Sequence, residues 1–81
     1  MELWETRDLM ISSDYKERFK AEYYQLKIRY KKLRDIINKY DNGTLSFELT
    51  CPITILRKQK AAMALYLDNL EHRAALEGIN L

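Results

Sequence analysis

The sequence predicts an all-α protein: an antiparallel two-helix hairpin with a short N-terminal arm, assembling into a helical-bundle oligomer. Glycine and proline, which all-β folds need in numbers, contribute only two residues and one residue to a chain of 81. Within residues 13–41, apolar side chains recur at alternating spacings of four and three, which places them along one side of a long helix. These are Phe19, Tyr23, Leu26, Tyr30, Leu33, Ile37 and Tyr40.

Residues 1–12 are predicted to form an N-terminal arm or a short helix. Apolar Leu3, Trp4, Leu9 and Ile11 alternate there with charged residues. One interpretation is an arm that docks on a neighbouring subunit. The other is a frayed terminus whose Trp4 covers the end of the bundle.

The helical hairpin is predicted to span residues 13–81, and its first helix about 13–41. Asp14 is a competent N-cap, and its spacing from Glu17 resembles a capping box. Asp41, Asn42 and Gly43 follow the last seam residue, and the asparagine and the glycine tolerate the left-handed conformation of a helix C-terminus. We therefore expect the helix to end at this point.

Residues 42–52 are predicted to form a loop. Leu45, Phe47 and Leu49 alternate there with polar residues, which is typical of an extended segment. An isolated strand would leave its backbone groups unpaired, so we expect an ordered loop, or a strand only if another copy pairs with it.

The second helix is predicted over about 53–77. Pro52 suits a first helical turn, with Thr50 or Cys51 as its cap, and Gly78 is the expected stop. An apolar stripe predicts the face that meets the first helix: Ile53, Leu56, Met63, Tyr66, Leu67, Leu70 and Ala74.

A partial second stripe on the first helix predicts self-association. Tyr24, Ile28 and Ile36 lie off the seam, and a lone hairpin would leave them in water. In addition, a core of this size supplies only about 3 to 5 kcal/mol. We therefore predict a homo-oligomer with these three residues at its interface.

Chemistry-bearing residues are scarce, so we expect no enzyme, metal site or cofactor. The chain has one His, one Cys and no phosphate-binding glycine loop or metalloprotease motif. Glu71 and His72 are interpreted as surface residues rather than ligands of a shared metal, and Cys51 as a loop residue rather than a reactive thiol. No apolar run reaches membrane-spanning length, and charges occupy the place of a signal-peptide core, so we expect a cytoplasmic protein.

Basic residues are the main candidates for ligand binding, although the net charge is only +2. An antiparallel hairpin would bring the region of Lys31 and Arg34 beside that of Arg57, Lys58 and Lys60. This cluster favours a phosphate-bearing or acidic ligand, with tyrosines nearby to stack on a base. In the competing interpretation, the basic residues form a solvated helix face, and Tyr30 and Tyr40 serve only to pack in the core.

Three stretches, YKERFKAEYYQLKIRYKKL, GTLSFELTCPI and LRKQKAAMALYLDNLEHRAALEGINL, resemble small proteins of bacterial phages and prophages, including a family first named from crAss-like phage. The resemblance spans residues 14–81. It implies an accessory protein in the cytoplasm of a bacterial host that works by binding, as inhibitors of host defence do. Some such inhibitors are helical oligomers that sequester cyclic nucleotide signals.

Three hypotheses follow. The first is a non-enzymatic inhibitor of a host defence, which binds either a defence protein or an anionic nucleotide through Arg57, Lys58 and Lys60, aided by Lys31 and Arg34. The second is a nucleic-acid-binding accessory protein that uses the same cluster. The third is a helical adaptor that binds a protein through the stripe of Tyr24, Ile28 and Ile36.

Overall fold

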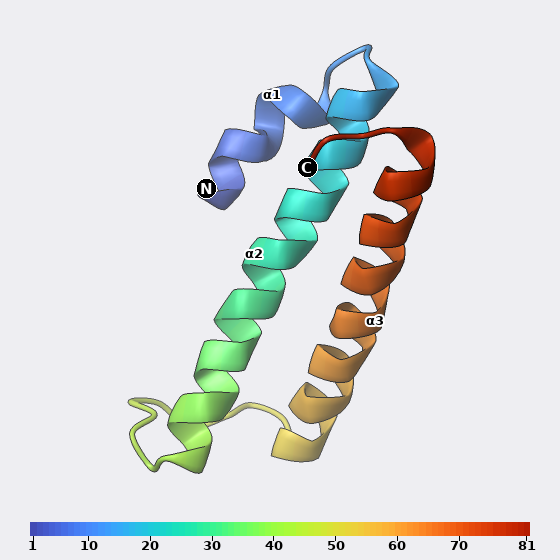
Figure 1. Ribbon diagram of the computed structural model, residues 1–81. Helices are drawn as coiled ribbons and strands as arrows, with labels where there is room; N and C mark the ends of the chain where they lie inside the picture. Colours follow the sequence, from blue (N-terminus) through green and yellow to red (C-terminus); the bar gives the residue numbers. More distant parts are fainter.

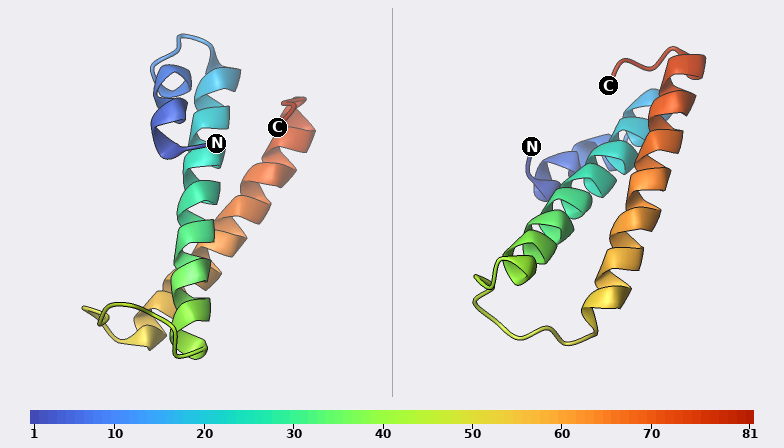
Figure 2. Two further views of the ribbon diagram at one scale, coloured as in Figure 1. Left: turned by 90° about the vertical axis from the view of Figure 1, so that its left-hand side faces the viewer. Right: turned by 60° about the horizontal axis from the view of Figure 1, so that its bottom comes forward.

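The computed structural model describes residues 1–81, and the all-α prediction is confirmed (Figure 1). A 3-10 turn, η1 (Leu3–Thr6), leads directly into the short helix α1 (Arg7–Met10), and two long helices follow, α2 (Tyr15–Asp41) and α3 (Ile53–Glu77). The long helices run in opposite directions with inclined axes, and α2 lies between α3 and the N-terminal segment (Figures 1 and 2). Residues 42–52 contain no strand, as predicted for a loop.

The termini of α2 use the predicted caps, but the predicted capping box does not form, because the Asp14 amide donates to the Ser12 hydroxyl at 3.1 Å rather than to Glu17. Asp14 is the N-cap, and its carboxylate accepts a 3.0 Å hydrogen bond from the Lys16 amide. At the other end Gly43 has φ +70°, and the Thr44 amide donates to the Lys39 carbonyl at 2.9 Å. The predicted last residue, Asp41, is the observed one.

The start of α3 corrects the predicted cap. Pro52 lies outside the helix as its N-cap, with an extended ψ of 143°, rather than in the first turn behind Thr50 or Cys51. No side chain caps this end. Proline suits the position because its fixed φ matches the observed −60° and it has no N–H to leave unpaired.

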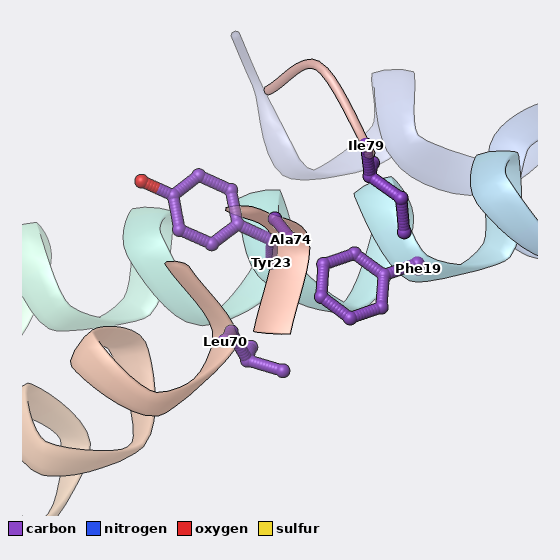
Figure 3. Close-up of a cluster of buried hydrophobic side chains, with 5 residues drawn as sticks. All are labelled: Phe19, Tyr23, Leu70, Ala74 and Ile79. Atoms are coloured by element: carbon purple, nitrogen blue, oxygen red, sulfur yellow. The ribbon is translucent and has the colours of Figure 1, made fainter. Parts of the chain in front are cut away.

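The hydrophobic core lies at the end of the molecule away from the loop. Five buried side chains meet there, from α2, α3 and the segment after α3 (Figure 3). The chain reverses at Gly78, whose φ of +68° allows the Ile79 amide to bond the Ala74 carbonyl at 2.9 Å and turns the Ile79 side chain inward. The predicted seams supply the rest of the cluster: Phe19, Tyr23, Leu70 and Ala74.

The N-terminal segment packs on its own α2, on the side opposite the seam. Ala21 is 1% exposed, and a side chain this small lets the segment approach closely. Thr6 is buried there, where its hydroxyl donates to the Leu3 carbonyl and accepts from the Gln25 amide. The segment is thus helical from Leu3 to Met10 and lies on α2 of the same chain.

The predicted interface stripe is half-buried within the single chain. Tyr24 and Ile28 line a cavity together with Met1 and Glu2, so the N-terminal segment covers part of the surface that a lone hairpin would expose. Ile36 is also half-buried. An oligomer interface at these residues stays a prediction.

None of the helices combines the length and apolar character needed to cross a membrane.

Candidate functional site

A cavity of about 290 Å³ lies between α2 and α3, in the half of the molecule near the loop. We call it the inter-helix cavity. Two residues of α2 and four of α3 line it: Tyr30, Ile37, Arg57, Lys60, Ala61 and Ala64. The alanines open the space, because a larger side chain on α3 would fill the gap between the helices. Its apolar and aromatic walls carry two cations, a combination suited to a small planar anion.

Arg57 is already held by an acid. Its guanidinium donates two hydrogen bonds to the Asp41 carboxylate, at the C-terminus of α2, one of them at 3.2 Å between Nη1 and Oδ2. These bonds, with added attraction from Lys60, lower the pKa of Asp41, and the same contact raises the pKa of Arg57. A ligand anion that binds Arg57 therefore has to compete with Asp41.

Lys60 is the cation of the cavity without a carboxylate partner. No acidic oxygen lies within 4 Å of its ammonium, and the side chain is half-buried. Tyr30 across the cavity is also half-buried, and its hydroxyl bonds to no protein group. The Lys60 ammonium and the Tyr30 hydroxyl are thus both free to bond to a ligand in the inter-helix cavity.

The other predicted binding residues lie elsewhere. Lys31 follows Tyr30 directly, and one residue turns a helix by about 100°, so Lys31 lines a second cavity on another side of α2. Arg34 is half-buried, and its nearest acid is Asp35, at 3.8 Å. Lys58 is exposed and lines neither cavity. Of the five predicted residues, only Arg57 and Lys60 share a site.

The second cavity, also about 290 Å³, lies between α2 and the start of the chain. Lys27, Lys31 and Lys32 line it, but so do Glu2 and Asp35. Mixed charge makes it a weaker anion site than the inter-helix cavity.

Sequence reasoning did not anticipate the acids that face the cations and tyrosines. Asp41 was interpreted only as part of the helix stop, although an acid at the last turn of one helix can reach a base near the first turn of an antiparallel one. Three tyrosine hydroxyls likewise donate to glutamates across the α2–α3 interface: Tyr15 to Glu77, Tyr23 to Glu71 and Tyr66 to Glu22. Glu71 is therefore bonded to Tyr23, and the next residue, His72, is exposed.

Tyr40 lies away from the inter-helix cavity. It lines a hollow of about 530 Å³ beneath the loop, where Phe47, Leu49 and Cys51 also lie. This hollow is lined mainly by apolar side chains, and no lysine or arginine faces it.

Comparison with known proteins gives one match. The model of a family described as Sequestin matches residues 13–76, which include α2, all of α3 but its last residue, and the whole inter-helix cavity. No curated protein and no solved structure matches the chain significantly. The family name is consistent with a binding or sequestering role. The match covers more than three quarters of the chain, and the chain therefore belongs to the Sequestin family.

Proposed function

We propose that this protein is a non-enzymatic sequestering protein that holds an anionic nucleotide in the inter-helix cavity. The observation that carries the proposal is the convergence of Lys60, Arg57 and Tyr30 on one small, otherwise apolar space. In the setting that the phage resemblance implies, the bound nucleotide is a signal of a bacterial defence system, and its removal from solution blocks that defence.

The cavity walls suit the base of such a ligand. Tyr30 offers an aromatic face, and aromatic stacking on a nucleobase contributes about 1 to 3 kcal/mol. Ile37, Ala61 and Ala64 complete an apolar surface from both helices.

The cations suit the phosphate. Lys60 is free to pair with a phosphate oxygen, and Arg57 can exchange Asp41 for a second oxygen, because a guanidinium binds phosphate and carboxylate with the same fork of N–H donors.

The test is isothermal titration calorimetry against a panel of cyclic di- and trinucleotides. Lys60→Glu is expected to abolish binding and Arg57→Glu to weaken it by at least about tenfold, since each adds a repulsive charge at the phosphate. Lys58→Glu is the matched control: it makes the same charge change on the same helix at a position outside the cavity. No heat with any nucleotide, or an equal loss with Lys58→Glu, would refute the assignment.

Nucleic acid is the second candidate ligand, favoured by the lysines that α2 carries on its other side, Lys27, Lys31 and Lys32. Such binding would weaken steeply with salt, and it would be lost in Lys31→Glu but kept in Lys60→Glu. The two candidate functions are therefore separated by one pair of variants.

A further inference from the structure

The side of α3 that faces away from α2 carries a second seam, which we call the outer face. Its residues recur at alternating spacings of three and four, the pattern of a coiled-coil seam. All are exposed, and Leu65 and Leu76 are 73% and 76% exposed. The outer face consists of Ile55, Lys58, Ala62, Leu65, Asn69, His72 and Leu76.

The chain exposes more surface than a compact monomer of its mass, and the excess is about the area that one protein–protein interface buries on each partner. Its accessible surface is 5917 Å². A compact monomer of 9.7 kDa is expected to expose about 5,100 Å². The excess of about 800 Å² equals what one partner buries in a standard protein–protein interface. Because only nine residues are buried, the single chain leaves much of its apolar surface without a partner.

The polar residues of this region fit a parallel pair of α3 helices. Asn69 occupies the seam position at which one asparagine fixes register and favours a two-stranded assembly. Asp68 and Arg73, which flank the seam on opposite sides, are five residues apart, the separation that brings such charges together between parallel helices. Arg73 bonds Tyr15 and Glu77 through Nη2 and Nε and is still 45% exposed, so its Nη1 can reach a second acid.

We propose that the outer face of α3 binds a second copy of this chain, as a parallel, two-fold-symmetric pair in which Leu65, Asn69 and Leu76 each meet their own counterpart. The contact runs from Ala62 to Leu76. Lys58 lies beyond its N-terminal end, where the long side chain keeps its ammonium in water. Lys60 and Ala64 line the inter-helix cavity from a side of α3 well away from the outer face, so pairing leaves that wall of the cavity open.

The outer face fits a second copy better than the stripe of Tyr24, Ile28 and Ile36. Those three side chains are already half-buried within the single chain, whereas Leu65 and Leu76 expose most of their surface to solvent.

Sedimentation equilibrium at micromolar concentrations tests the pairing. The wild-type chain is expected to sediment as a dimer, and Leu65→Glu and Leu76→Glu to weaken association by at least about tenfold, because each buries an unpaired charge against its own counterpart. Ile11→Glu is the matched control, since Ile11 is 69% exposed but lies outside the outer face. A monomeric wild type, or a dimer unaffected by both leucine variants, would overturn the proposal.

Disulfide trapping tests the same contact without introducing a charge. In a Cys51→Ser background, Leu65→Cys is expected to form a disulfide with its own counterpart under mild oxidation, since paired seam positions lie within bridging distance. Lys39→Cys, exposed on α2, is expected to stay reduced. If Leu65→Cys crosslinks only to Leu76→Cys in a mixture, the helices are antiparallel and the parallel arrangement is wrong. A monomer in which this face binds only another protein would exclude the second copy.

Discussion

The Tyr23 hydroxyl of α2 donates a 2.8 Å hydrogen bond to the Glu71 carboxylate of α3. Tyr23 is 5% exposed and its ring packs in the core, while its hydroxyl points away from the other core side chains (Figure 3). One residue thus contributes both apolar burial and a charge-assisted bond between the long helices. Burial, reinforced by the bond to Glu71, raises the pKa of Tyr23 to about 12.

Tyr23→Phe is expected to lower the free energy of unfolding by about 1 to 2 kcal/mol, because it removes a bond to a charged group and keeps the packed ring. Urea denaturation followed by circular dichroism measures the change. Tyr40→Phe is the control, since Tyr40 is exposed, and it is expected to alter stability by less than about 0.5 kcal/mol. Equal losses in the two variants would contradict a role for the Glu71 bond.

The raised pKa of Tyr23 predicts an alkaline decline in stability. The folded chain holds the phenol proton more tightly than the unfolded chain, whose tyrosine has the ordinary pKa of 10.0. The resulting stabilisation is complete below pH 10 and is lost as the pH rises through about 12. The difference in unfolding free energy between wild type and Tyr23→Phe should therefore shrink across this interval. A constant difference would contradict the shift.

Asp41→Asn is expected to raise affinity for an anionic nucleotide by about two- to fivefold, because it frees the Arg57 guanidinium from an exposed ion pair. Calorimetric titration measures the effect. Asp35→Asn is the matched control, since it removes the carboxylate nearest Arg34, outside the cavity. If Asp41→Asn leaves the affinity unchanged, Arg57 does not contact the ligand.

Gly78→Ala is expected to cost about 1 kcal/mol of stability. The added Cβ meets no atom within 4 Å, so the cost comes from the backbone, whose φ of +68° disfavours a side chain. Gly78→Asn should cost less, because asparagine tolerates this conformation. Thermal unfolding of the three proteins gives the order, and a loss in Gly78→Asn as large as in Gly78→Ala would instead indicate crowding at this turn.

Helices were the part of the fold that the sequence predicted well. The bounds of α3 and the end of α2 agree with prediction, because proline and glycine act locally and the seam spacing repeats over many turns. The predicted seam residues Leu33 and Ile37 are also buried.

Contacts that depend on polar or very small residues could not be predicted. Ala21 and Gln25 receive the N-terminal segment, yet neither forms part of an apolar stripe, so the cover over this side of α2 left no signal in the sequence. The residues of the predicted basic cluster lie at different sites because adjacent helical residues, such as Tyr30 and Lys31, point about 100° apart. Of the candidate site, the sequence indicated the cations Arg57 and Lys60 and the aromatic Tyr30, and it missed the Asp41 contact.

The position of the core sets where the molecule can open. The buried residues of α3 are Leu70 and Ala74, both in its second half, and the three tyrosine–glutamate bonds lie in the same half. Amide hydrogens of α3 near Ala74 should therefore exchange with solvent more slowly than those near Arg57. The half that holds the inter-helix cavity can then widen to admit a ligand while the other half stays folded, and a bound ligand would slow exchange mainly around the cavity.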